Sequence, residues 1–166
     1  MRLFVGVFPP ASVRADLRRA LPSGLKLTAV EQWHVTLAFL GEVPEERLSD
    51  VEQALDGVST TSSRGIGLRL AGGGRFTNGR SVALWAGVAG DLAGLSGLRA
   101  DICAGLAGYD DRPFRPHLTI AYSRGGQALA ALESYAGPTW TVDEFVLVRS
   151  RYNEGGGYDH LRSWAC

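Results

Sequence analysis

The sequence predicts a domain of mixed strands and helices that is built from two related halves. Segments rich in β-branched and aromatic residues alternate with segments whose apolar residues recur at helical spacing. A His-x-Thr motif in apolar surroundings occurs twice, at His34 and His117, and the two copies are separated by half the length of the chain. Such a separation indicates an internal duplication.

Strands are expected where β-branched and aromatic residues cluster between turn residues. Gly41 closes the second strand, and the run Gly72–Gly74 is expected to connect the third to the fourth. Pro113 and Pro116 stand just before the fifth strand. They do not argue against it, because proline is tolerated at the edge of a sheet. A turn over Asn153–Gly157 joins the last two. The seven expected strands are Arg2–Phe8, Trp33–Leu40, Ile66–Leu70, Val82–Val88, Leu118–Tyr122, Thr141–Ser150 and Tyr158–Trp164.

Four helices are expected between these strands. The first two begin at Pro10 and Pro44, since proline is favoured in the first turn of a helix. Asp91 can cap the third helix, and the fourth helix is expected to be short, over Gln127–Tyr135. The first is expected to end near Pro22. Apolar residues at helical spacing support the first three helices: Val13, Leu17 and Leu21; Leu48, Val51 and Leu55; and Leu92, Leu95, Leu98, Ile102 and Leu106.

Composition is that of an ordinary globular protein, with 45% apolar residues, 20% charged residues and no net charge. No run of eighteen apolar residues indicates a membrane span, and the apolar stretch Leu3–Phe8 is too short for a signal peptide. Cys103 and Cys166 form no disulfide or metal-binding pattern. We therefore expect a cytoplasmic protein, and nothing in the sequence implies an obligatory protein partner.

The two His-x-Thr motifs are the strongest functional signal. They read His34-Val35-Thr36-Leu37-Ala38 and His117-Leu118-Thr119-Ile120-Ala121. Because side chains alternate along a strand, each His and the Thr two residues later project from one face. Val35, Leu37 and Phe39 are then expected in the core, as are Leu118 and Ile120. Two such strands facing each other would bring two imidazoles and two hydroxyls around one small space.

This constellation suits the hydrolysis of a cyclic phosphodiester. Imidazole has an unperturbed pKa of about 6.5, so that one neutral ring can accept a proton from water while one cationic ring protonates the leaving sugar oxygen. Threonine hydroxyls can donate to the phosphoryl oxygens as negative charge develops. A lone His-x-Thr is commonly structural, but two matched copies favour function. The residues alone leave open which His plays which part.

Other candidates are weaker. Arg115 lies two residues before the second His and would share its face on a continuous strand, and Arg149 and Arg151 could line a cleft or be solvated. His160 has no Thr partner and is expected at the surface. Single aromatic residues could stack on a base, although core packing is the better expectation for each: Trp33, Phe39, Phe76 and Tyr152. No cluster of residues has metal-ligand spacing, so neither a metal nor another cofactor is expected.

Motifs along nearly the whole chain match the pattern of one family. They are Arg2-Leu3-Phe4-Val5 with Pro9-Pro10, Trp33-His34-Val35-Thr36-Leu37 with Phe39-Leu40-Gly41, Gly74-Arg75-Phe76, Leu84-Trp85-Ala86-Gly87-Val88, Phe114-Arg115-Pro116-His117-Leu118-Thr119, and Phe145-Val146-Leu147 with Tyr158 and Leu161. By these motifs the chain resembles the 2H phosphoesterase superfamily, in its RNA 2′,3′-cyclic phosphodiesterase (2′-5′ RNA ligase-like) branch.

The resemblance implies an α+β fold in a single bilobal domain over residues 1–166, with a pseudo-twofold internal duplication. Two antiparallel sheets would form a V-shaped cleft with helices outside and one motif in each lobe. The resemblance also implies that His34 protonates the leaving oxygen, that His117 activates water, and that Thr36 and Thr119 hold the phosphate. The implied product is a 2′-phosphate, made without a metal.

Two positions depart from the family pattern. Ala38 stands where relatives often carry Lys, and Tyr122 where they often carry Arg. Arg124 or Arg115 can substitute for that Arg, or Tyr122 can donate a neutral hydrogen bond to the phosphate.

The resulting hypothesis is hydrolysis of a 2′,3′-cyclic phosphate on an RNA 3′ end or a small nucleotide. The alternatives are the same site acting on 2′-5′-linked oligonucleotides or on another cyclic phosphate, or a module that binds nucleotides or RNA ends without turnover. Because the chain has no net charge, recognition is expected mainly at the RNA terminus.

Overall fold

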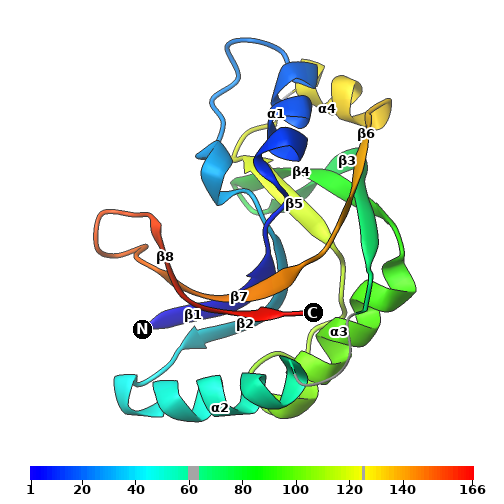
Figure 1. The fold of residues 1–166 in the computed structure, drawn as a ribbon. Coiled ribbons are helices and arrows are strands. Elements are labelled where there is room, and N and C mark those ends of the chain that lie inside the picture. The colour runs from blue at the N-terminus through cyan, green and yellow to red at the C-terminus, as the bar shows by residue number, and fades with distance from the viewer. Residues whose placement is uncertain (60–63, 125) are drawn as a thin grey trace.

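The computed structural model describes residues 1–59, 64–124 and 126–166, which form two four-stranded antiparallel sheets (Figure 1). In chain order the elements are β1 (Arg2–Val7), α1 (Ala11–Ala20), η1 (Val30–Gln32), β2 (Val35–Glu42), η2 (Glu45–Arg47), α2 (Leu48–Ser59), β3 (Gly67–Asn78), β4 (Ser81–Gly90), α3 (Leu92–Gly105), β5 (His117–Ala121), α4 (Gly126–Glu133), β6 (Ala136–Thr141), β7 (Glu144–Ser150) and β8 (Tyr158–Ala165).

The two sheets repeat one arrangement around the two motifs. The first sheet has the order β2-β1-β7-β8 and the second has the order β5-β4-β3-β6. Each motif strand, β2 or β5, lies at the edge of its sheet and is reached from its neighbour through a helix, as β1–α1–β2 and β4–α3–β5. The fold therefore agrees with the two related halves that the sequence predicts.

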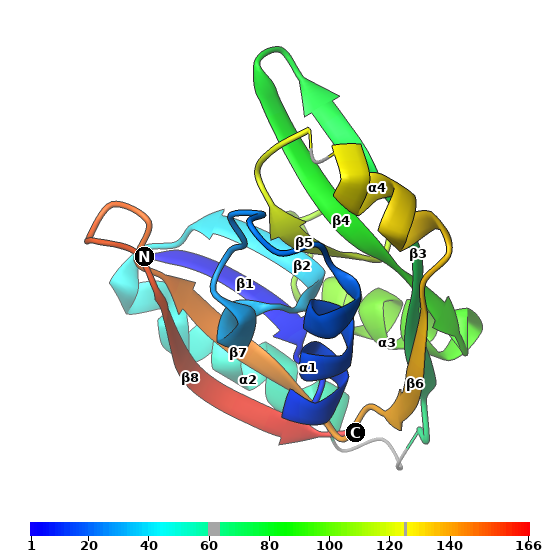
Figure 2. The ribbon, with the colours of Figure 1, turned by 90° about the horizontal axis from the view of Figure 1, so that it is seen from above.

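One apolar core joins the two sheets. It contains Leu3 and Val5 from the first sheet together with Leu68, Leu84 and Leu118 from the second, all fully or almost fully buried. The helices pack around it: α4 contacts β3, α1 contacts β6, and α3 contacts both β2 and α2. In Figure 1 α2 and α3 lie at the bottom of the molecule and α1 and α4 at the top, and in Figure 2, seen from above, α1 and α4 are nearer the viewer.

The helix starts agree closely with the sequence. Pro10 precedes α1, and Pro44 precedes the short helix η2, which leads into α2. The carboxylate of Asp91 accepts a hydrogen bond from the Gly94 amide at 2.8 Å, so it caps α3 as expected. None of the described helices is long and apolar enough to cross a membrane.

The glycine run was wrongly expected to be a connection, because it lies inside β3. A side chain would not fit there: a Cβ atom on Gly73 would come within 2.6 Å of the Trp85 carbonyl oxygen and 2.7 Å of the Leu132 Cβ. On Gly74 it would come within 2.7 Å of the Trp85 ring. These glycines allow β4 and α4 to approach the strand, whose turn comes later, at Gly79.

Two further expectations were wrong. The strand expected over Thr141–Ser150 begins later, as β7, and the preceding strand β6, which ends at Thr141, was not expected. β6 is an edge strand, where its Pro138 is tolerated. Phe39 does not enter the core, because an extra residue at Leu37 shifts the register of β2 against β1 and turns Phe39 to the other face.

Candidate active site

His34 lies immediately before β2, and its ring is held by two hydrogen-bonding partners. Nδ1 is 2.7 Å from the carbonyl oxygen of Gln32, and Nε2 is 3.0 Å from the hydroxyl oxygen of Thr36. A carbonyl oxygen only accepts, so Nδ1 carries the proton of the neutral ring and Nε2 accepts from the Thr36 hydroxyl. The motif's spacing therefore joins its two polar side chains directly.

Aromatic rings enclose the His34 imidazole. Phe4 stacks on it with ring centroids 4.6 Å apart, Phe8 lies at 5.3 Å, and Tyr158 presents an edge at 5.5 Å. Burial lowers the pKa of His34 from 6.5 to about 4, against the opposing effect of the Gln32 carbonyl, and the charges of His117 and His160 lower it further. His34 is consequently neutral near pH 7 in the free protein.

His117 is the first residue of β5 and repeats the backbone contact of His34. Its Nδ1 donates to the carbonyl oxygen of Arg115 at 2.6 Å, two residues earlier in the chain, as Gln32 is for His34. The neutral ring thus keeps Nε2 free to accept a proton. Phe76 and Trp85 form T-shaped contacts with the ring, at centroid distances of 5.0 and 6.1 Å. This shared backbone contact could not be predicted from the spacing of the motif residues.

The motif residues line two adjoining cavities of about 430 and 440 Å³, one at each histidine. The first, here the His117 cavity, is lined by Thr36, Leu37, Phe76, Arg99, Asp110, Arg112, Pro113, Phe114, Arg115 and His117. The second, here the His34 cavity, is lined by Arg2, Phe4, Thr28, Gln32, His34, Thr36, Phe39, Thr119, Tyr122, Ser150, Tyr152, Gly156, Gly157 and Tyr158. Thr36 belongs to both, so the two cavities adjoin at this residue. Together, here called the cleft, they are lined by both imidazoles and both threonines.

The remaining candidates divide between the cleft and the surface. Tyr122 lines the His34 cavity with 71% of its surface exposed, and Arg115 lines the His117 cavity. Arg124 lines neither cavity, and its backbone carbonyl accepts a hydrogen bond from Arg75 at 3.4 Å. The structure therefore brings Tyr122 and Arg115 to the cleft but not Arg124.

The weaker candidates also separate. Phe76 lines the His117 cavity, and Phe39 and Tyr152 line the His34 cavity. Trp33 is a core residue with 1% exposure, as expected of a single aromatic residue. The other three lie outside both cavities: Arg149 bonds to Glu154, Arg151 pairs with Asp159, and His160 is exposed beside Phe8.

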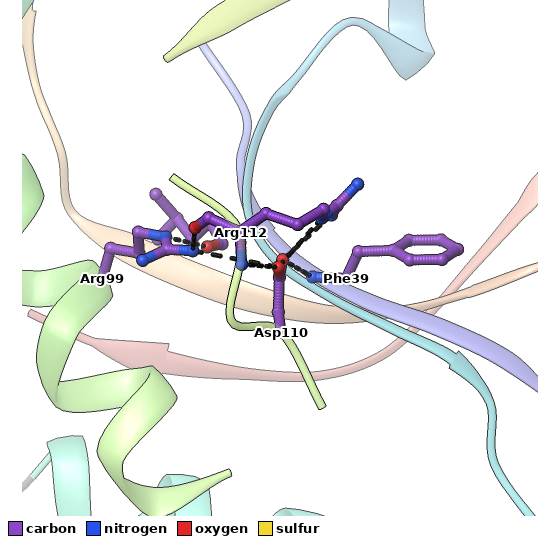
Figure 3. Close-up of polar contacts among 5 residues, drawn as sticks. Phe39, Arg99, Asp110 and Arg112 are labelled. Atoms are coloured by element: carbon purple, nitrogen blue, oxygen red, sulfur yellow. Dashed lines mark hydrogen bonds and ion pairs between the residues drawn. The ribbon is translucent and has the colours of Figure 1, made fainter. Parts of the chain in front are cut away.

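A polar cluster that was not predicted from the sequence lies in the wall of the His117 cavity; its contacts are drawn in Figure 3. Asp110 accepts hydrogen bonds from the Phe39 amide at 2.9 Å and from the Nε and Nη2 atoms of Arg112 at 2.9 and 3.0 Å. Arg99 donates to the carbonyl oxygens of Leu37 and Arg112. The sequence places Asp110 and Arg112 just before the second motif, but their contact with β2 depends on tertiary structure.

Hydrogen bonds from Arg112, together with the Phe39 and Arg112 amides, hold the pKa of Asp110 well below its usual range, although burial opposes this shift. Asp110 is therefore ionised throughout the neutral range. Elsewhere, no group of three or more His, Cys, Asp or Glu side chains among the described residues is arranged to hold a metal ion. The expectation that the site needs no metal stays a prediction.

Comparison with known proteins identifies the family. The family model of the 2′-5′ RNA ligase superfamily matches residues 9–154. The RNA 2′,3′-cyclic phosphodiesterase of Thermus thermophilus is 36% identical over 94% of this chain and 85% of its own. The crystal structure of Escherichia coli LigT complexed with 3′-AMP superposes with a TM-score of 0.75 at 26% identity, covering 99% of this chain and 96% of that one. These matches confirm the resemblance and the α+β fold with two antiparallel sheets: the chain belongs to the 2′-5′ RNA ligase superfamily.

Proposed function

We propose that this protein hydrolyses the 2′,3′-cyclic phosphate of an RNA 3′ end or a small nucleotide to a 2′-phosphate. The observation that carries the proposal is the matched pair of imidazoles, each bonded to a backbone carbonyl and each lining one of two adjoining cavities that share Thr36. The activity for which the relatives are named, RNA 2′,3′-cyclic phosphodiesterase, supports the substrate class.

The proposed reaction needs two proton transfers and no covalent intermediate. His117 Nε2 accepts a proton from water as the water oxygen bonds to phosphorus. The bond from phosphorus to the 3′ oxygen breaks, and His34 Nε2 gives that oxygen its proton. Thr36 and Thr119 donate to the non-bridging oxygens, whose negative charge increases in the transition state. Afterwards the proton on His117 returns to His34 through solvent.

The low pKa of His34 places a condition on this assignment. A ring with a pKa of about 4 carries almost no proton at pH 7, so an acid at this position must gain one when substrate binds. The anionic phosphate would supply the cause, because a negative charge close to the ring favours its cationic form. Until then the Thr36 hydroxyl occupies Nε2, and on binding it can turn to a phosphate oxygen.

The function is tested by offering the wild-type protein 2′,3′-cyclic AMP, 3′,5′-cyclic AMP and the 2′-5′-linked dinucleotide of adenosine, with EDTA present. We expect turnover of the 2′,3′-cyclic substrate, with 2′-AMP as the product identified by ³¹P NMR. Formation of 3′-AMP would show that the other ester bond breaks. Binding of 2′,3′-cyclic AMP without turnover would favour the non-catalytic binding module instead.

A further inference from the structure

The two parts of the cleft differ in charge. Three arginines, Arg99, Arg112 and Arg115, line the His117 cavity against a single aspartate, Asp110. Among the described residues that line the His34 cavity, Arg2 is the one arginine or lysine. Since the chain as a whole has no net charge, the positive charge beside His117 is a local feature, suited to an anionic group close to the reacting phosphate.

Asp110 fixes the orientation of Arg112. Its side chain is 5% exposed and meets Nε and Nη2 of Arg112 in a two-point contact, while 64% of the Arg112 side chain remains exposed. The guanidinium carbon lies 5.5 Å from the centre of the Phe39 ring. A guanidinium has five N–H groups, so those not used by Asp110 are available to a ligand in a fixed direction.

The same aspartate ties this arginine to the first motif strand. It accepts from the Phe39 amide on the edge of β2, and Arg99 donates to the neighbouring Leu37 carbonyl at 3.2 Å (Figure 3). These contacts join the loop before His117 to the strand that carries Thr36. Through these contacts Arg112 is connected to both halves of the cleft.

We propose that the His117 cavity binds the phosphodiester that precedes the terminal nucleotide of an RNA substrate, with Arg112 as the binding residue and Asp110 as the residue that positions it. A guanidinium matches the paired oxygens of a phosphodiester. Phe76, 37% exposed in the same cavity, offers a face to the penultimate base. The terminal nucleoside occupies the His34 cavity, among its tyrosines. This inference rests on the proposed function.

The test compares 2′,3′-cyclic AMP with a diadenosine RNA dinucleotide that ends in a 2′,3′-cyclic phosphate. Only the dinucleotide carries the second phosphate. For Arg112→Gln we expect the KM for the dinucleotide to rise about tenfold, which is the usual effect of losing a charged hydrogen bond. The KM for 2′,3′-cyclic AMP and both kcat values should stay within about twofold. Arg18→Gln, on α1 and outside both cavities, removes an equal charge and should change neither KM.

The positioning role is tested by Asp110→Asn alone and combined with Arg112→Gln. If Asp110 acts through Arg112, Asp110→Asn also raises the KM for the dinucleotide, and the double variant binds it no worse than Arg112→Gln does. Asp111→Asn, the neighbouring exposed carboxylate, is the matched control. Circular dichroism shows whether each variant is folded.

Two results would overturn this inference while leaving the proposed function intact. One is an equal effect of Arg112→Gln on both substrates, and the other is an independent, additive effect of Asp110→Asn on the KM for the dinucleotide. Failure of the wild type to turn over either substrate would instead count against the proposed function itself.

Discussion

His34 is a candidate catalytic residue, and its burial in neutral form lowers the stability of the fold at acid pH. Aromatic rings surround it and its pKa is lowered to about 4, whereas the pKa of an unfolded histidine is about 6.5. The unfolded chain therefore binds a proton at this residue more readily than the folded chain does. Stability that depends on His34 is complete above pH 6.5 and is lost as the pH falls towards 4.

We expect the wild-type protein to lose about 2 kcal/mol of unfolding free energy through His34 between pH 7 and pH 4.5. His34→Gln, which cannot take up this proton, should lose less over the same interval. Urea unfolding at the two pH values measures the difference. Asp110, whose pKa is also lowered, loses its contribution only at a more acidic pH, where an unfolded aspartate takes up a proton. Equal pH dependence of the two proteins would show that His34 is not buried in its neutral form.

At the scale of elements, β3 shows how backbone proximity can outweigh local sequence signals. A run of three glycines normally favours a turn, yet here it continues a strand because β4 and α4 pack too closely for side chains. Whether these glycines form a turn or a strand is decided by the packing of Trp85 and Leu132 against them, and both lie in other elements of the fold. Periodicity within the segment could not have revealed it.

Gly73→Ala should destabilise the fold by about 1–3 kcal/mol, because its Cβ would collide with backbone in β4 and with Leu132. Gly97→Ala in α3 is the matched control: apart from its chain neighbours and the backbone of its own helix, its Cβ would meet no described atom closer than 3.9 Å. Alanine is favoured over glycine in a helix by about 1 kcal/mol. Urea unfolding should therefore shift in opposite directions for the two variants. A neutral Gly73→Ala would contradict the close packing.

At the scale of the whole molecule, we propose that residues 1–166 form a single bilobal domain. The shared core that joins Leu3 and Val5 to Leu68, Leu84 and Leu118 supports the proposal. If the domain is single, it unfolds as one unit. Gly73→Ala, in the second sheet, should then lower the unfolding midpoint observed at Trp164, in the first sheet, as much as the midpoint observed by far-ultraviolet circular dichroism. Separate midpoints would indicate two domains.

The sequence predicted what repeats along the chain, and it missed what depends on contact between distant segments. Alternation placed the side chains of each His-x-Thr motif on one face, and helical spacing located the first three α-helices. The inward direction of Phe39 was wrong because a bulge in β2 interrupts the alternation. Asp110 and Arg112 escaped notice because their partner is the edge of a strand some seventy residues earlier, at Phe39.

We propose that His34, just before β2, and His117, the first residue of β5, cleave the cyclic phosphate by acid–base catalysis. The most direct test measures kcat for wild type, His34→Ala and His117→Ala on 2′,3′-cyclic AMP and on its analogue with sulfur as the 3′ bridging atom. A thiolate leaves without a proton, so the analogue does not need the acid. His160→Ala, at the exposed third histidine, is the control.

We expect each of the first two variants to lose on the order of 10²–10⁴ in kcat on the natural substrate. On the sulfur analogue His34→Ala should recover to near the wild-type rate, while His117→Ala stays slow. Recovery of His117→Ala in place of His34→Ala would show that His117 is the acid and His34 the base. A near wild-type rate for either variant on the natural substrate would contradict the two-histidine account.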